Sequence, residues 1–152
     1  MFQNVSNDSA LGYAQLQEQS VNILHIEDSP ADQTLARLSL KRGQLACQIT
    51  VADSLQATQA ALQAQNFDLI LADYHLPGFT ALDVWDIVRQ QPEHPPFVLL
   101  SGAIGESAAV DIMRLGISDY LLKDQINSLP HVVQRAMEVH EARRAHRRAM
   151  QE

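Results

Sequence analysis

The chain has 152 residues, a net charge of −7 and 46% apolar residues, an ordinary composition for one globular domain with a sizeable core. Its single cysteine, Cys47, excludes an internal disulfide, and the sequence has no Cys/His pattern of a zinc site. We find neither an apolar run long enough to span a bilayer nor a signal-peptide pattern, so we expect a cytoplasmic protein without membrane contact.

Charge is distributed unevenly along the chain. Residues 1–127 hold 15 acidic and 6 basic side chains, a net charge of −9, whereas residues 128–152 hold 5 arginines and 3 glutamates, a net charge of +2. The acidic body argues against nucleic-acid binding, which depends on basic side chains that neutralise phosphates. The basic segment is the one place where such binding could occur, but a solvated helix face is the favoured interpretation.

Short apolar runs alternate with helical patterns from residue 21 onward, after a polar segment, 1–19, that we interpret as a flexible leader. The predicted strands are 21–26, 47–51, 67–72, 97–100 and 119–122. A helix is predicted after each of them, at 30–43, 55–62, 80–90, 106–115 and from 128 onward. We therefore expect a domain over 20–127 and an extended last helix over 128–152. His25, inside the first strand, is expected to be a core histidine with satisfied hydrogen bonds.

Five strand–helix pairs in succession predict an α/β fold. Crossovers between parallel strands are right-handed, which leaves few topologies. We predict a doubly wound, flavodoxin-like parallel sheet of five strands in the order 2-1-3-4-5, with an extended C-terminal helix. Sheets of this kind bind ligands beyond the carboxyl ends of their strands, near the point where the strand order reverses.

Polar side chains stand at the carboxyl ends of four predicted strands. Glu27 and Asp28 follow the first strand, Asp73 the third, Ser101 the fourth and Lys123 the fifth. Each residue alone is more often a turn former, a helix cap or a solvated side chain. Because the four strand ends meet at one edge of the sheet, their joint occurrence predicts three carboxylates, a hydroxyl and an amine in one place.

This combination of groups suits phosphoryl chemistry. Three crowded carboxylates repel one another unless a cation neutralises them, and Mg²⁺ binds a few carboxylates, keeps several waters and bridges to phosphate oxygens. A carboxylate can also act as a nucleophile that forms an aspartyl phosphate. The pattern therefore favours Mg²⁺-dependent chemistry at Asp73, with the Lys123 ammonium and the Ser101 hydroxyl directed to phosphoryl oxygens.

Four segments occur in the order and at the spacing of a known family. They are 23–30 (ILHIEDSP), 68–78 (DLILADYHLPG), 98–102 (VLLSG) and 119–123 (DYLLK). They resemble the motifs of response regulator receiver domains, which act in two-component signalling, and the resemblance covers about residues 20–127. It implies a phosphoprotein of a phosphorelay whose phosphoacceptor is Asp73.

The resemblance also implies the ligands of the metal. Asp28, Asp73 and the backbone carbonyl of His75 would bind Mg²⁺ directly, and Glu27 would bind it through water. Glu27 stands where the family more often has Asp, so we expect a slightly different metal geometry. Asp124 follows the lysine where many members have a cis proline. Because a cis bond before a non-proline residue costs about 3–4 kcal/mol, we expect a trans bond or a strained loop there.

The remaining site residues are assigned roles by the same resemblance. Lys123 would contact the phosphoryl group, and Ser101 and Tyr120 would form a switch pair that alters a protein-interaction face. The implied partners are a histidine kinase or phosphotransfer protein and a downstream output protein or output domain. Such a chain is not an enzyme in the usual sense, because it catalyses only its own phosphotransfer and autodephosphorylation.

Two alternatives remain open. A pseudo-receiver would dock partners without being phosphorylated, and failure to bind Mg²⁺ near Asp73 would support it. A phosphohydrolase with an aspartyl-phosphate intermediate usually has a second acid two residues past its nucleophile. His75 stands at that position, which counts against an enzyme of this class.

The last helix carries a seam of heptad type. Leu129, Val132, Ala136 and Val139 recur at spacings of three and four residues, and the pattern then reaches Arg143. We expect the first half of the helix to pack on the domain and the second half to project. The helix could belong to a stand-alone receiver or serve as a signalling linker or coiled coil in a longer protein, and its seam predicts a homodimer.

Overall fold

A computed structural model of the chain describes residues 20–102 and 106–151. The predicted leader, 1–19, lies outside the described residues. The elements are β1 (Val21–Ile26), α2 (Pro30–Arg42), β2 (Cys47–Ala52), α3 (Leu55–Ala64), β3 (Leu69–Asp73), β4 (His75–Leu76), β5 (Phe79–Thr80), α4 (Ala81–Val88), β6 (Phe97–Ser101), α5 (Glu106–Arg114), β7 (Asp119–Leu122), the 3₁₀ helix η1 (Lys123–Ser128) and α6 (Leu129–Gln151). Within the described part of the chain, every helix is too short or too polar to cross a membrane.

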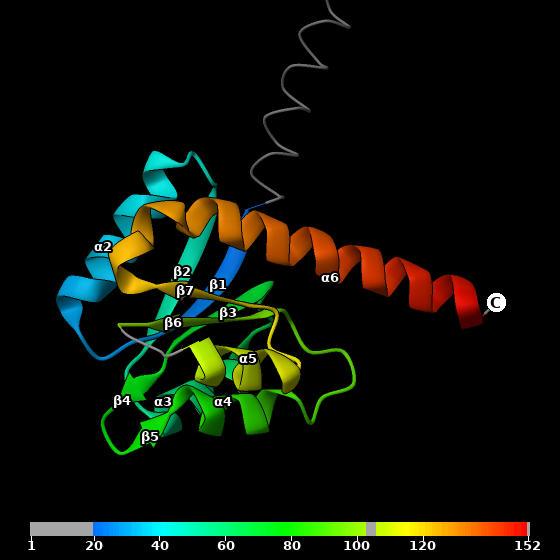
Figure 1. Cartoon of the computed structure of the whole chain (residues 1–152), viewed down its shortest axis with the longest axis horizontal. Coiled ribbons are helices and arrows are strands. Elements are labelled where there is room, and N and C mark those ends of the chain that lie inside the picture. The colour runs from blue at the N-terminus through cyan, green and yellow to red at the C-terminus, as the bar shows by residue number, and fades with distance from the viewer. Residues whose placement is uncertain (1–19, 103–105, 152) are drawn as a thin grey trace, which may run out of the picture.

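Five parallel strands form one sheet in the order β2-β1-β3-β6-β7. This order is the predicted 2-1-3-4-5, because the short strands β4 and β5 form a separate pair and shift the later numbers. The order reverses between β1 and β3, which is where doubly wound sheets bind ligands. The registers place Asp73 beside Leu100 and Ser101 beside Leu122, so the carboxyl ends of these strands share one edge (Figure 1).

Helices cover both faces of the sheet (Figure 1). One core cluster joins a face of the sheet to α3, α4 and α5, and a second cluster joins the other face to α2 and α6. Alternation along β3 divides its side chains between them, with Ile70 and Ala72 in the first cluster and Leu69 and Leu71 in the second. A central strand that is buried on both faces requires the continuous apolar run seen in the sequence.

Side-chain caps begin the helices near the predicted positions. Ser29 accepts a hydrogen bond from the backbone N–H of Asp32 (3.3 Å) at the start of α2, and Ser54 caps α3 in the same way. The backbone N–H of Thr80 donates to the Asp83 carboxylate (2.9 Å) as part of a capping box on α4. The cap on α2 has a consequence for the site, because it orients the first turn of this helix toward the end of β1.

Two short elements were not predicted from the sequence. Strands β4 and β5 form a small hairpin around Pro77 and Gly78, and Gly78 has a positive φ of 80° that favours glycine. The six residues of η1 connect β7 to α6. Both elements are too short to produce a periodic pattern. The described residues contain no cis peptide bond, so the bond between Lys123 and Asp124 is trans.

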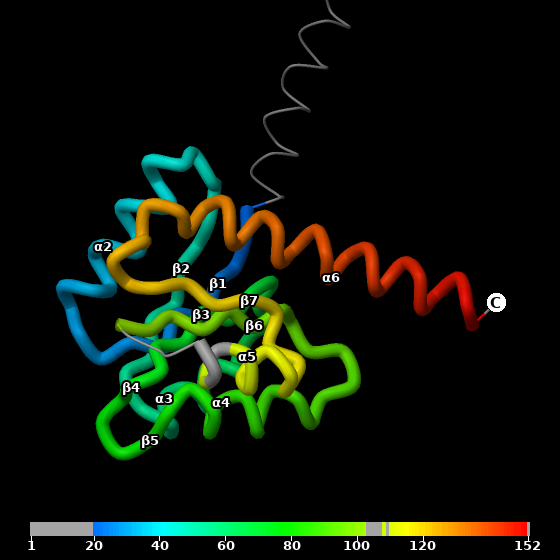
Figure 2. The backbone as a smooth tube through the Cα atoms, viewed as in Figure 1, coloured from blue at the N-terminus to red at the C-terminus, as the bar shows by residue number. Residues whose placement is uncertain are grey.

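Helix α6 packs its apolar residues on the domain in its first half, and Arg144 in the second half lies 3.9 Å from Glu93. Leu129, Val132 and Ala136 are buried, whereas Val139 is 45% exposed. The second half of the helix projects away from the body, as the backbone path in Figure 2 shows. The buried residues from Leu129 to Ala136 agree with the expected packing of the first half, and the end of the helix extends beyond the body.

The His25 side chain is buried in β1 among apolar neighbours. It is 1% exposed, and neither ring nitrogen has a partner among the described residues. The sequence correctly predicts a core histidine, but the prediction that its hydrogen bonds are satisfied is wrong, because its register partners are the apolar Val51 and Leu71. Burial lowers the pKa of His25 from 6.5 to about 4.

We expect His25→Leu to reduce the loss of stability in acid. Between pH 6.5 and about 4 the unfolded chain protonates this histidine and the folded chain does not, so stability falls as the pH falls. The melting temperature of the variant, taken relative to that of the parent, should therefore rise as the pH falls over that range. The matched control is His131→Leu, at an exposed position on α6, which should keep the parental slope. Parallel profiles for parent and His25→Leu would contradict the prediction.

Candidate functional site at the carboxyl edge of the sheet

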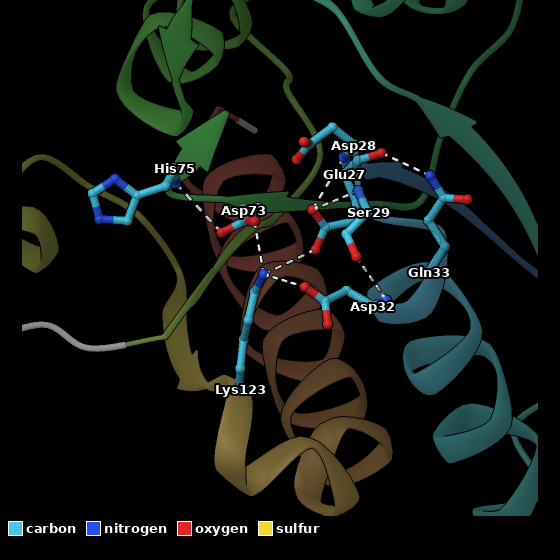
Figure 3. A network of polar contacts seen from close by, with 8 residues as sticks. All are labelled: Glu27, Asp28, Ser29, Asp32, Gln33, Asp73, His75 and Lys123. Carbon is cyan, nitrogen blue, oxygen red and sulfur yellow. Dashed lines mark hydrogen bonds and ion pairs between the residues drawn. The ribbon is translucent and has the colours of Figure 1, made fainter. Parts of the chain in front are cut away.

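The residues predicted at the strand ends come from four elements. Glu27 directly follows β1, Asp73 is the last residue of β3, and Ser101 is the last residue of β6. Lys123 begins η1 directly after β7. Figure 3 shows the Lys123 side chain directed toward Glu27 and Asp73. The convergence that the alternating pattern predicts for these three residues is thus present in the structure.

Lys123 contacts three carboxylates at once (Figure 3). Its Nζ lies 3.1 Å from Glu27 Oε1, 2.8 Å from Asp73 Oδ2 and 2.6 Å from Asp32 Oδ2. An ammonium group has three N–H donors, so all three contacts can be hydrogen bonds. The carboxylate oxygens lie within 4.8 Å of one another, and the single ammonium offsets only part of their charge.

The pKa values of Glu27 and Lys123 reflect this crowding. Burial raises the pKa of Glu27 most, Asp73 raises it as well and Lys123 opposes them, so that the pKa shifts overall from 4.5 to about 7. For Lys123, burial alone would lower the pKa, but hydrogen bonds to Asp32, Asp73 and Glu27 outweigh it and raise the value. Lys123 therefore remains a cation throughout the physiological range.

Glu27 folds back onto the loop that follows it. Its Oε2 accepts hydrogen bonds from the backbone N–H groups of Asp28 (3.0 Å) and Ser29 (3.4 Å), and its side chain is fully buried. The Gln33 side chain donates to the backbone carbonyl of Glu27 (2.9 Å). The extra methylene of Glu relative to Asp lets this carboxylate contact Lys123 and its own loop at the same time.

Asp73 is held from both sides. Its Oδ2 accepts from Lys123, and its Oδ1 accepts from the backbone N–H of His75 at 3.3 Å (Figure 3). Its side chain is only 6% exposed, whereas His75 itself is exposed. The carboxylate is thus oriented by the first residue of the β4–β5 hairpin as well as by the lysine.

Three predicted site residues lie outside this network. Asp28 is exposed, and no hydrogen bond to its side chain is found among the described residues. Ser101 is fully buried, and its Oγ has no partner among those residues. Tyr120 is half-buried and packs against the core cluster that includes Trp85. An unpartnered buried hydroxyl beside the Asp73 strand end is a group that can still accept a partner.

Asp32 is the site residue that the sequence reasoning missed. It belongs to the first turn of α2, and with Glu27 and Asp73 it forms the carboxylate group able to hold a metal ion. The signal was present, because a helix was predicted to begin at Pro30, and Asp32 lies within one turn of that start. The predicted metal set contains Asp28 in its place.

The donor set fits a hard divalent cation. Carboxylate oxygens from Glu27, Asp32 and Asp73 converge, and the exposed Asp28 adjoins them in the sequence. Ions such as Mg²⁺ bind oxygen ligands of this type. The cluster can therefore hold such an ion, and its negative charge attracts the cation.

We expect Glu27 to lower the stability of the metal-free chain as the pH rises from 4.5 to about 7, opposite in sign to the contribution of His25, and Glu27→Gln to remove this contribution. In this range the folded chain holds a proton on Glu27 that the unfolded chain releases, so stability is lost as the folded group ionises. Urea unfolding in the presence of a chelator measures the slope. The control is Glu138→Gln at an exposed position of α6, which should leave the slope unchanged. If stability depends on pH with the same slope in Glu27→Gln and in the parent, the raised pKa of Glu27 is refuted.

Comparison with known proteins adds independent information. A family model described as "Response regulator receiver domain" matches residues 23–134. Transcription factor prr1 of Schizosaccharomyces pombe is 34% identical over 103 residues, which cover 66% of this chain and 18% of prr1. Sensor protein GacS of Pseudomonas syringae pv. syringae is 25% identical over 114 residues, which cover 71% of this chain and 12% of GacS. The chain spans less than a fifth of either relative.

A solved structure resembles the chain over most of its length. The Mn(2+)-bound form of response regulator Rcp1 is 25% identical, with a TM-score of 0.62. The match covers 72% of this chain and 91% of the Rcp1 chain. Unlike the curated relatives, Rcp1 is therefore matched almost in full.

Proposed function

The chain belongs to the response regulator receiver domain family, and on that premise we propose that it is a phosphoryl-accepting switch of a two-component phosphorelay with Asp73 as the acceptor. The observation that carries the proposal is the contact between Asp73 and Lys123 at the end of the central strand β3. A nearly buried carboxylate with a lysine at 2.8 Å combines a nucleophile with a positive charge for phosphoryl oxygens.

The proposed reaction is a phosphoryl transfer between side chains. A carboxylate oxygen of Asp73 attacks the phosphorus of a phosphohistidine on the partner, the new O–P bond forms as the N–P bond breaks, and the released imidazole takes up a proton. Such transfers depend on positioning and charge stabilisation more than on covalent machinery. Lys123 supplies positive charge, and the buried Ser101 hydroxyl is available to donate to a phosphoryl oxygen.

Mg²⁺ is the proposed cofactor. Asp28, Asp73 and the backbone carbonyl of His75 would hold it directly, and Glu27 through water. When bound, the ion would neutralise the carboxylates and the phosphoryl oxygens. The carboxylate cluster supports this proposal, and so does the similarity to Rcp1, whose structure is described as Mn(2+)-bound.

Ser101 and Tyr120 are the proposed switch pair. Ser101 would move to the phosphoryl group, and Tyr120 would turn inward against the core cluster that it already contacts. The face that would change is formed by α5, β7 and α6. Phosphorylation would thereby shift the population between two packings of this face.

The proposed partners are a histidine kinase or phosphotransfer protein, and an output protein or output domain. One relative is described as a transcription factor and another as a sensor protein, and the match covers only a small part of each. Both descriptions are compatible with α6 as a signalling linker to a further module. A cytoplasmic location is part of the proposal.

Two alternative functions are less well supported by the same residues. A phosphorylation-independent docking module gives no reason for the Lys123–Asp73 contact or for the carboxylate cluster around it. A phosphohydrolase would lack its second acid, because the exposed His75 stands two residues past Asp73. We therefore propose no turnover of a metabolite, only self-catalysed phosphorylation and dephosphorylation.

We expect the intact mass of the protein to rise by one phosphoryl group after brief exposure to acetyl phosphate and Mg²⁺. Asp73→Asn should not gain it, because an amide is a poor nucleophile, and omission of Mg²⁺ should abolish the gain. Mass spectrometry of the intact chain is the measurement. If the parent gains nothing and also fails to bind beryllofluoride, the docking-module alternative takes the place of the switch.

We also predict a homodimer through α6. Val139, in the middle of the helix, and Met150, near its end, are 45% and 75% exposed, which favours burial against a second helix. Light scattering with and without beryllofluoride measures the molar mass. A Val139→Glu variant should remain monomeric, and a monomeric parent under both conditions would remove the dimer from the proposal.

A further inference from the structure

Asp32 makes the shortest of the three contacts of Lys123, yet it has no role in the proposed switch. The distance from Lys123 Nζ to Asp32 Oδ2 is 2.6 Å, against 2.8 Å to Asp73 and 3.1 Å to Glu27. Asp32 is also the most exposed of the three carboxylates, at 30% of its side chain. It can therefore move or change partner at a smaller cost than the buried Glu27.

The position of Asp32 is set by helix α2 rather than by the sheet. The Ser29 cap accepts from the Asp32 backbone N–H, and Gln33, the next residue, donates to the Glu27 carbonyl. Figure 3 shows Lys123 between α2 on one side and Asp73 on the other. The ammonium is thus shared between a helix and the strand that carries the proposed acceptor.

Phosphorylation would change this sharing. The following inference rests on the proposed function, in which Asp73 acquires a phosphoryl group that Lys123 must contact. The phosphoryl group and the Asp32 carboxylate then compete for one ammonium, and their negative charges repel each other across a cluster only 4.8 Å wide. Both effects oppose the phosphorylated form.

We propose that Asp32 is a positioning residue that retains Lys123 in the unphosphorylated chain and must release it to the phosphoryl group. It acts through Lys123 and does not touch the phosphorus. By this means it lowers the affinity of the site for a phosphoryl group while its charge raises the affinity for the divalent cation. A neutral residue at position 32 should therefore shift the two affinities in opposite directions.

The test uses the full chain and beryllofluoride, a stable mimic of the phosphoryl group, at saturating Mg²⁺. Asp32→Asn should bind beryllofluoride roughly two- to fivefold more tightly than the parent, as expected for the loss of a partly exposed ion pair that competes with the ligand. In separate titrations without beryllofluoride, the same variant should bind Mg²⁺ more weakly. Isothermal titration calorimetry measures both affinities.

Three further variants complete the experiment. Asp32→Glu retains the charge and should stay close to the parent in both titrations. Asp86→Asn changes a side chain that is 61% exposed on α4, outside the site, and should change neither. Circular dichroism verifies folding, and Asp32→Ser replaces Asp32→Asn if the latter does not fold.

Each outcome is decisive. Unchanged or weaker beryllofluoride binding by the neutral variant overturns the positioning role, and weaker binding of both ligands identifies Asp32 as a structural support of the site. A parent that binds no beryllofluoride refutes the proposed function itself, which separates the two failures. Opposite shifts in the two affinities support the role of Asp32.

Discussion

The hydrogen bonds of Lys123 hold together side chains that would otherwise repel one another. Three carboxylates from the end of β1, the first turn of α2 and the end of β3 lie within 4.8 Å of one another, and the ammonium contacts all three. Removing charges from water is costly and is offset only by close, well-oriented partners. The pKa of Glu27, raised to about 7, shows that one lysine compensates this cost only in part.

The sheet explains why the charges meet at this edge. β3 is buried on both faces, so Asp73 can reach solvent and ligands only at the strand end. Because the strand order reverses between β1 and β3, the chain segments that follow these two strands diverge. The carboxyl ends of the strands are therefore left accessible. A polar residue that directly follows the apolar run of such a strand therefore lies close to the site.

Sequence patterns predict those parts of the structure that depend on periodicity and strand order. The contact of Lys123 with Glu27 and Asp73 follows from the position of each residue at the end of a strand. Asp32 was missed because its proximity depends on how α2 leaves the sheet, which the Ser29 cap sets in three dimensions. The lack of partners for His25 was missed for a similar reason, since polarity along a strand does not reveal what packs across it.

The sequence also did not predict the directions of individual side chains. Asp28 and Ser101 occupy predicted positions, yet one is exposed and the other is fully buried. Asp28 lies in the bend after β1, and Ser101 is the last residue of β6, so the strand pattern does not fix the surroundings of either side chain. Their roles as ligand and switch residue depend on those surroundings and therefore remain proposals.

Helix α2 and the segment that begins at Lys123 are joined at two points. Lys123 contacts Asp32 at the start of α2, and the buried Ser39 near the other end of the helix donates to the Ile126 carbonyl at 2.6 Å. Ile126 lies in η1, which leads directly into α6. If a phosphoryl group draws Lys123 from Asp32, the first tie between α2 and η1 is lost while the second persists. A change of charge at Asp73 would thereby alter the contacts of η1, the segment that leads directly into α6.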